Sequence, residues 1–253
     1  MSADVVRVNH DAHCHVADYA DAAGVLQACD RDGVEVVCVT VHPEQYEALA
    51  AAGFAANSLA VRVVPGLHPQ ELPAAESQLP RLLEIIEPSA WVGEIGLDGV
   101  DPSRETQASQ RRVLYAVLDA CASRGQLDKR LTLHSRRTAG DLLDLLDGGF
   151  PNAVLHWFSG DGSSLERAMG ERRWFSVNPA MAGSRAGRFI LKALPRDRVV
   201  YESDGPYAMC DGRPARPSDA GAVVRALASL WEIGEANVAE MLNANWAALN
   251  GEA

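Results

Sequence analysis

Hydrophobic positions along the chain fall into short runs separated by longer amphipathic stretches, and the two kinds alternate from end to end. The short runs are rich in β-branched residues and are continuously apolar, a pattern typical of parallel strands buried on both faces. Eight such runs predict strands at Val5–Val8, Val34–Val41, Val61–Val64, Ala90–Ile95, Leu131–Leu133, Ala153–Leu155, Trp174–Val177 and Arg198–Tyr201.

Between the runs, apolar residues recur at the spacing of an amphipathic helix. Helices are predicted at Ala22–Asp32, Leu79–Glu87, Arg104–Arg124, Ala139–Leu146 and Leu165–Glu171, and two more after the last strand at Pro217–Trp231 and Glu235–Leu249. Alternating strands and helices permit an open doubly wound sheet or a closed barrel. The dinucleotide-binding pattern G-x-G-x-x-G does not follow the first strand, and no Pro/Gly/Ser-rich linker divides the chain. We therefore expect one α/β domain over residues 1–253.

Residues that can bind metal ions or move protons follow the predicted strands one after another. In chain order they are His13 and His15, His42, His68, Glu94, His134, His156, Asn178 and Asp204. In a barrel the carboxyl ends of all strands converge on one rim, where enzymes of this fold have their active sites. The pattern favours a TIM-like (β/α)8 barrel over an open sheet.

Two of these carboxylates and four of these imidazoles could form a dinuclear metal centre. In an extended segment the spacing of His13 and His15 turns both rings to one face. The candidate ligands are His13, His15, Glu94, His134, His156 and Asp204, which suffice for two adjacent divalent ions if Glu94 bridges them. Two such ions can clamp a phosphodiester and activate water, with Asp204 accepting the proton. Glu94 and Asp204 are thus the candidate catalytic residues.

Other polar residues of the predicted rim divide into substrate-binding candidates and structural ones. His68 could hydrogen-bond a substrate phosphate, and the guanidinium fork of Arg136 suits a phosphate oxygen. His10 and His42 are expected to be structural, and Cys14 to pack in the core.

Composition narrows the class of substrate and the compartment. The 253-residue chain has a formal net charge of −11, and Lys129 and Lys192 are its only lysines. A broad basic groove for duplex DNA is therefore not expected, whereas a short or single-stranded substrate remains compatible. The five cysteines form no C-x-x-C pair, and no apolar run is long enough for a membrane span. We expect a cytoplasmic protein with free thiols and no membrane association.

The motifs in this order resemble the TatD family of metal-dependent deoxyribonucleases. The matching segments span nearly the whole chain: Asp11-Ala-His-Cys-His15, Gly66-Leu-His-Pro69, Gly93-Glu-Ile-Gly-Leu-Asp98, His134-Ser-Arg136, His156-Trp-Phe-Ser-Gly160, Glu202-Ser-Asp-Gly-Pro-Tyr207 and Asn243-Ala-Asn-Trp246. Within the family the chain looks most like the TatD-type nuclease of Qat anti-phage defence systems. Trp157 and Gly99 depart from the family pattern at the pocket wall, so substrate preference does not carry over.

The resemblance implies a barrel that hydrolyses DNA from an end, with two divalent ions, Mg²⁺ or Mn²⁺ in activity and Zn²⁺ as an option. It implies that His13, His15, Glu94 and Asp204 surround one ion, and that Glu94, His134 and His156 surround the other. Single-stranded DNA or DNA ends would be the substrate, and proteins of the same defence system would be companions.

Two other readings remain open at this point. A small-molecule amidohydrolase or lactonase also uses H-x-H, later histidines and a final aspartate on a barrel, but many of them bridge two metals with a carbamylated lysine. Here Glu94 stands at the end of the fourth strand, and neither lysine is placed to substitute. The second reading is a subunit of a defence complex that a partner gates, or that has kept the barrel for assembly alone.

Overall fold

The computed structural model describes residues 7–54 and 60–252. Its strands are β1 (His10–Cys14), β2 (Glu35–Val39), β3 (Val61–Val64), β4 (Trp91–Gly96), β5 (Arg130–His134), β6 (Ala153–Leu155), β7 (Trp174–Val177), β8 (Val199–Tyr201), β9 (Met209–Cys210) and β10 (Arg213–Pro214). Its α-helices are α1 (Ala22–Asp32), α2 (Pro43–Ala51), α3 (Leu79–Ile85), α4 (Arg104–Ser123), α5 (Ala139–Leu146), α6 (Gly162–Gly170), α7 (Pro179–Gly183), α8 (Arg185–Ala193), α9 (Ala220–Trp231) and α10 (Glu235–Asn250).

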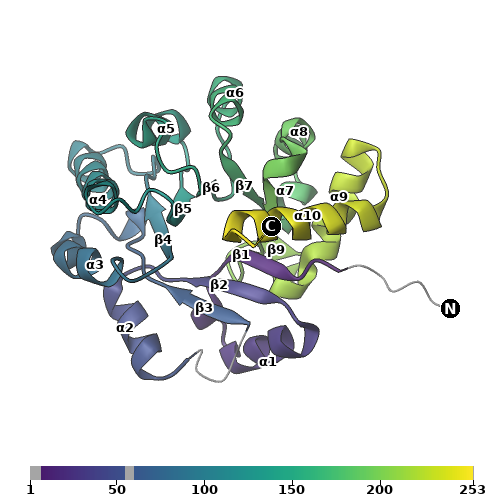
Figure 1. Ribbon diagram of the computed structural model, residues 1–253, viewed down its shortest axis with the longest axis horizontal. Helices are drawn as coiled ribbons and strands as arrows, with labels where there is room; N and C mark the ends of the chain where they lie inside the picture. Colours follow the sequence, from purple (N-terminus) through teal and green to yellow (C-terminus); the bar gives the residue numbers. More distant parts are fainter. Residues whose placement is uncertain (1–6, 55–59, 253) are drawn as a thin grey trace. The chain divides into compact units, whose positions relative to one another are not determined.

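The chain forms two compact units. Among the described residues, one consists of 7–38, 60–62 and 175–252, and the other of 39–54 and 63–174. Strands alternate with helices along the sequence, as the hydrophobic pattern predicts, and Figure 1 follows this order by colour. The prediction of a single domain over residues 1–253 stays a prediction.

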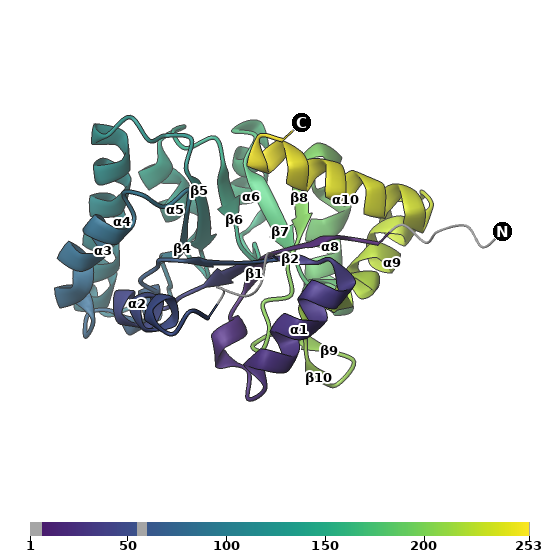
Figure 2. The ribbon, with the colours of Figure 1, turned by 60° about the horizontal axis from the view of Figure 1, so that its bottom comes forward.

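In the first unit, strands from the two ends of the chain lie together. β1 runs parallel to β2, and β7 runs parallel to β8. Main-chain hydrogen bonds join β1 to the segment after β8, from Asp204 N–H to His13 O at 3.0 Å and from His15 N–H to Gly205 O at 2.9 Å. Helix α10 lies beside β8 in Figure 2, and its Asn245 Nδ2 donates to Val199 O of β8 at 2.7 Å. The carboxyl ends of the first and eighth strands are therefore neighbours.

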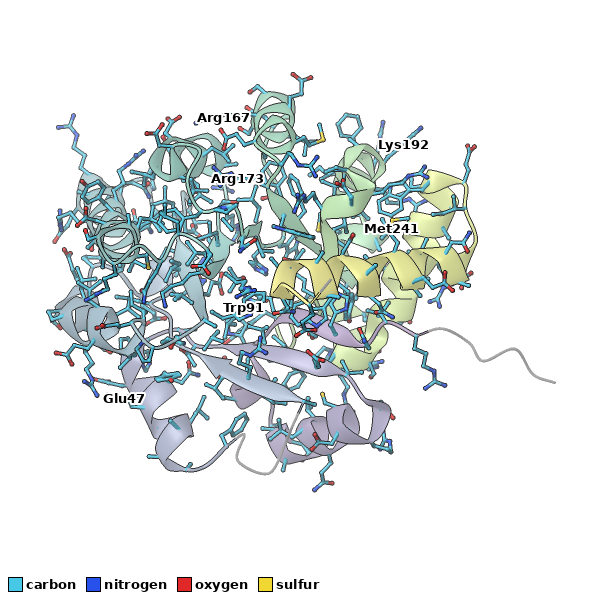
Figure 3. All side chains as sticks on the ribbon, in the orientation of Figure 1. Glu47, Trp91, Arg167, Arg173, Lys192 and Met241 are labelled. Carbon is cyan, nitrogen blue, oxygen red and sulfur yellow. The ribbon has the colours of Figure 1, made fainter. Side chains whose placement is uncertain are left out.

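In the second unit, β4, β5 and β6 form a parallel sheet in sequence order. Helices α3, α4, α5 and α6 follow one another around these strands (Figure 1). The side chain of Trp91, labelled in Figure 3, is buried at the start of β4. At the same end of the sheet, the Lys129 ammonium donates hydrogen bonds to the carbonyl oxygens of Ile86, Glu87 and Ser89, just after α3. A cation thus satisfies the acceptors left at a helix C-terminus.

The first strand was wrongly placed by the hydrophobic pattern. Val5–Val8 was predicted, but residues 5 and 6 lie outside the described residues and Arg7 and Val8 lie in no strand. The strand is the polar segment His10–Cys14, all of it buried. His10 and Asp11 of this strand accept hydrogen bonds from main-chain N–H groups far along the chain, which hydropathy alone does not reveal. His13 therefore lies within the strand, and only His15 follows it.

The structure has three short helices that the sequence analysis did not predict, α2, α7 and α8, and a side-chain cap defines the start of each. The caps accept hydrogen bonds from main-chain N–H groups of the first turn, as N-cap residues do. They are His42 Nδ1 for α2, Asn178 Oδ1 for α7 and Ser184 Oγ for α8. His42 is thus structural, as predicted. Among the residues that the structure describes, no helix has the length and apolar character needed to cross a membrane.

His10 ties three elements of the first unit together. Its ring stacks on Trp246 of α10 with centroids 4.8 Å apart, and its Nε2 accepts the main-chain N–H of Tyr201 in β8 at 3.0 Å. Burial, which outweighs a hydrogen bond with Asn243, lowers the pKa of His10 to about 3. His10 is therefore neutral in the folded protein and acts as a structural acceptor.

This lowered pKa predicts a pH dependence of stability. The unfolded chain binds a proton at His10 below about pH 6.5, whereas the folded chain does so only near pH 3, so unfolding becomes easier as pH falls. Between pH 7 and pH 5, His10 should lower the free energy of unfolding by about 2 kcal/mol. His10→Gln lacks this titration. Urea denaturation in chelator at both pH values measures the effect, and parallel losses in the two proteins would contradict it.

Candidate metal centre

Three predicted ligands of the first unit form a buried cluster. His13 comes from β1, His15 directly follows β1, and Asp204 follows β8. The Nε2 atoms of the two histidines lie 3.4 Å apart, and Asp204 Oδ1 lies 3.8 Å from His13 Nε2 and 3.7 Å from His15 Nε2. All three side chains are buried. Two imidazole nitrogens and a carboxylate oxygen therefore converge, as donors around one cation do.

Asp11 holds this first cluster together, a role that the sequence analysis missed. Its Oδ1 accepts the main-chain N–H of His13 at 3.1 Å and that of Ser203 at 2.9 Å. One carboxylate thus links β1 to the segment that carries Asp204. Burial, opposed by these hydrogen bonds, raises the pKa of Asp11 to about 7. Asp204 has a φ of 49°, a left-handed backbone conformation that few non-glycine residues adopt.

The second unit holds another cluster around Glu94 of β4. His134, the last residue of β5, has its Nδ1 2.6 Å from Glu94 Oε1, and His68 Nε2 lies 3.2 Å from the same oxygen. His156, which directly follows β6, lies with its Nε2 at 4.0 Å. One ligand atom from each of His68, Glu94 and His134 lies within 4.8 Å of the others. The three strand ends thus bring imidazoles to one carboxylate.

Glycines beside Glu94 make this close approach possible. A Cβ at Gly93 would stand 2.0 Å from the side chain of Thr132, and one at Gly96 would stand 2.2 Å from His134 O. Gly96 also has a φ of 144°, which side chains rarely permit. Only glycines therefore allow β4 and β5 to pack this closely beside the carboxylate, against the Thr132 side chain at Gly93 and against the His134 backbone at Gly96.

Asp98 is a second residue whose role the sequence analysis missed, although it lies in the quoted motif. Its Oδ2 lies 2.8 Å from His134 Nε2 and accepts a hydrogen bond from Gln70 Nε2, also at 2.8 Å. Burial would raise the pKa of Asp98, but its hydrogen bonds with His134, Val100 and Gln70 lower it to about 2. A carboxylate on the outer nitrogen of a metal-binding imidazole fixes the orientation of the ring and strengthens it as a ligand.

The electrostatics of the second cluster suit a cation. Burial would lower the pKa of His134, but its hydrogen bonds with Asp98 and Glu94 raise it to about 9. Two carboxylates on either side of the ring thus favour positive charge there, which a divalent ion would also supply. Neutral imidazole nitrogens and carboxylate oxygens are the donors that Zn²⁺, Mn²⁺ and Fe²⁺ accept, and the carboxylates also suit Mg²⁺. The residues present therefore fit divalent metal ions.

The remaining candidates have distinct environments. His68 begins a 3₁₀ turn, where its Nδ1 accepts the N–H of Gln70, so the hydrogen on Nε2 points to Glu94. Arg136 is exposed, and no ion pair of its side chain occurs within residues 7–54 and 60–252. Cys14 is fully buried with its thiol on Gly205 O, so it belongs to the core as predicted.

A parallel α/β fold with buried imidazole and carboxylate donors at its strand ends is typical of metal-dependent hydrolases. The sequence model described as TatD related DNase matches residues 10–251. The chain therefore belongs to the TatD-related DNase family. The expected class of enzyme, a hydrolase of the deoxyribonuclease type, agrees with this membership.

Individual relatives support the same family. The chain is 29% identical over 226 residues to the human protein named Deoxyribonuclease TATDN3, a match that covers 78% of this chain and 77% of that protein. It is 28% identical over 160 residues to the 3'-5' ssDNA/RNA exonuclease TatD of Erwinia amylovora, covering 60% of this chain and 61% of the relative.

Solved structures confirm the predicted fold class. The TatD homolog YJJV of Escherichia coli superposes with a TM-score of 0.80 at 26% identity, covering 96% of this chain and 98% of that one. An uncharacterized amidohydrolase from Saccharomyces cerevisiae gives a TM-score of 0.79 at 15% identity, which shows likeness of fold alone. The chain has the α/β fold of the TIM-like metallo-dependent hydrolases.

The contact between Asp98 and His134 generates a prediction. Asp98→Asn removes a negative charge, and the amide has one acceptor oxygen where the carboxylate has two. His134 should therefore lose its fixed orientation. We expect about 10- to 100-fold weaker binding of Mn²⁺ or Zn²⁺, measured by isothermal titration calorimetry. Asp101→Asn is the control, because the Asp101 carboxylate accepts hydrogen bonds from Ser103 and Thr106 at the start of α4 and lies in neither cluster of candidate ligands. Equal affinities in the two variants would argue against this role.

Proposed function

We propose that this chain is a metal-dependent deoxyribonuclease that hydrolyses phosphodiester bonds, working inward from the end of single-stranded DNA. The observation that carries the proposal is the pair of buried clusters of imidazole and carboxylate at the strand ends of a TatD-family chain. The exonuclease activity named for the Erwinia relative supports hydrolysis from an end.

Each side chain has a proposed task. Two divalent ions, Mg²⁺ or Mn²⁺ in activity and Zn²⁺ as an option, would supply charge to polarise the phosphate and to lower the pKa of water. His13, His15 and Asp204 would hold one ion, and His134 and His156 the other, with Glu94 as the shared ligand. Asp204 would accept the proton of the attacking water. Asp11 would position the first group of ligands and Asp98 the second.

The substrate contacts follow from the surroundings of the second cluster. Arg136 is exposed two residues after His134, and its guanidinium can contact a phosphate oxygen with two hydrogen bonds. His68 is proposed to contact the substrate phosphate as well. That contact would replace the one that its Nε2 hydrogen makes to Glu94 in the absence of substrate, where it keeps that carboxylate in place.

A lysine-bridged amidohydrolase is the less favoured candidate. The Lys129 ammonium donates to three carbonyl oxygens beyond α3, and Lys192 lies on α8. Neither amine is within its own unit's cluster of ligands, whereas Glu94 is. A glutamate therefore stands where such enzymes use a carbamylated lysine.

We further propose a role in anti-phage defence, in the cytoplasm and with companion proteins of the same system. The resemblance to the TatD-type nuclease of Qat systems supports the defence role. The five cysteines, all free and buried, are compatible with a reducing compartment. Phage plaque counts on cells with wild-type protein or Asp204→Asn, within the complete gene system, test this role: equal counts would contradict it.

The proposed reaction is tested with end-labelled single-stranded DNA. Metal-stripped protein should leave the DNA intact, and Mg²⁺ or Mn²⁺ should restore stepwise shortening. Asp204→Asn should lower kcat by about 10²- to 10⁴-fold, because its amide cannot accept the proton. Glu94→Gln should lose bound metal together with activity. Full turnover by Glu94→Gln would contradict the dinuclear centre, and intact DNA with metal-loaded wild-type protein would contradict the nuclease.

Arg136→Ala tests the phosphate contact separately. Since the side chain is exposed and is not a proposed metal ligand, metal content should stay normal while KM for DNA rises by about tenfold or more, the effect of losing charged hydrogen bonds to the phosphate. Arg104→Ala, at the exposed start of α4, serves as the control for loss of one positive charge. An unchanged KM in Arg136→Ala at normal metal content would remove this residue from the site.

A further inference from the structure

Helix α8 carries a group of cations that differs from many other surface cations of this acidic chain. Many exposed arginines are neutralised by a carboxylate nearby. Pairs of this kind are Arg31–Asp32, Arg81–Glu47, Arg112–Glu76, Arg167–Asp144 and Arg213–Asp219. Within the described residues, no such ion pair involves Arg185, Arg188 or Lys192 of α8. Their positive charge is therefore available to a ligand.

These cations lie on one side of the helix together with an aromatic ring. Arg185, Arg188, Phe189 and Lys192 are spaced i, i+3, i+4 and i+7, which places them on a single face. We refer to these four residues as the α8 face. Phe189 is 72% exposed, the highest value among the large hydrophobic side chains that the structure exposes. Figure 3 labels Lys192 beside the ribbon of α8.

The opposite side of α8 fixes the helix in the first unit. Gly187, Ile190 and Leu191 are buried, and a Cβ at Gly187 would stand 2.3 Å from Met181 O of α7. The indole of Trp231 in α9 donates to Leu191 O at 3.1 Å. The α8 face is thus held outward by packing on both α7 and α9, and its exposure is a property of the fold.

We propose that the α8 face binds single-stranded DNA outside the metal centre, with its cations on phosphates and Phe189 against a base. From Arg185 to Lys192 the helix rises by about 10 Å, enough to accompany about three phosphates of a stacked strand. An exposed aromatic ring accepts a base of any sequence by stacking. The inference rests on the proposed function, because it gives the proposed substrate, single-stranded DNA, a second binding surface besides the metal centre.

Other occupants fit this face less well. A helix that lies in a membrane surface presents a broad apolar side, whereas Phe189 is the one large apolar side chain exposed on α8. A second copy of a chain with net charge −11 would be repelled over most of its surface. A polyanion with aromatic bases matches both the charge and the ring.

The test compares the salt dependence of DNA binding between two triple variants. Fluorescence anisotropy with a labelled 20-nucleotide strand is measured in chelator, so that no turnover or metal contact contributes. Replacing Arg185, Arg188 and Lys192 by Gln should flatten the slope of log K against log salt by about 2, about 0.7 for each cation released from phosphate. The control replaces Arg31, Arg81 and Arg112 by Gln, which removes the same charge from ion-paired sites and should leave the slope unchanged.

Phe189→Ser is measured in the same assay. It should weaken binding about fivefold at every salt concentration and leave the slope as in the wild type, because stacking releases no counterions. Equal slopes for the two triple variants would overturn the proposal. Two further results would also overturn it, each together with an unchanged slope. One is that the wild-type protein binds phosphatidylserine vesicles and the α8 variant alone does not. The other is that the wild-type protein self-associates in sedimentation and the α8 variant alone does not.

The binding assay keeps this inference separate from the proposed nuclease. If the slope flattens as expected but no DNA is hydrolysed when metal is restored, the nuclease fails and the DNA-binding surface stands. If DNA is shortened but the slopes are equal, the nuclease stands and the α8 face is excluded. If both the nuclease activity and the DNA-binding surface are confirmed, kcat/KM of the α8 variants should be lower than that of the wild type for the 20-nucleotide strand and unchanged for a dinucleotide.

Discussion

Burial of charged and polar groups at the strand ends is the constraint on which the rest of this structure depends. Glu94, Asp98 and Asp11 are almost completely removed from solvent, so each carboxylate requires donors from elsewhere in the fold. Asp11 takes two main-chain N–H groups, and Asp98 takes a histidine and a glutamine. These required hydrogen bonds fix where β1 meets the segment after β8 and where β4 meets β5. The same hydrogen bonds that satisfy the buried charges therefore set the positions of the candidate ligands.

The two clusters use this constraint in parallel ways. In each, a histidine-bearing strand end is held by a carboxylate that is not itself a proposed ligand, Asp11 in one case and Asp98 in the other. Removing such a partner leaves a ligand free to turn, which weakens a metal site without deleting any donor.

Much of the fold could be predicted from the sequence because its strands and long helices have strong periodic patterns. Val61–Val64, Ala153–Leu155 and Trp174–Val177 have the same bounds in prediction and structure, as does the helix Ala22–Asp32. The first strand was misplaced because His10, Asp11 and His13 are polar residues satisfied by distant partners. Short helices such as α7 were missed because one side-chain cap defines them. The ligand candidates followed from residue type and strand order, whereas the partners Asp11 and Asp98 depend on contacts that no local pattern records.

The burial of Lys129 has a consequence for the covalent chemistry of the protein surface. A chain with two lysines offers very few side-chain amines, and one of them is enclosed by the carbonyl groups beyond α3, with a pKa lowered by burial. Lys192, exposed on α8, is then the one lysine side chain that acylating or cross-linking reagents can readily reach. The wild-type chain thus offers nearly site-selective amine labelling on a rigid helix, which would report on whatever molecule approaches that side of the protein.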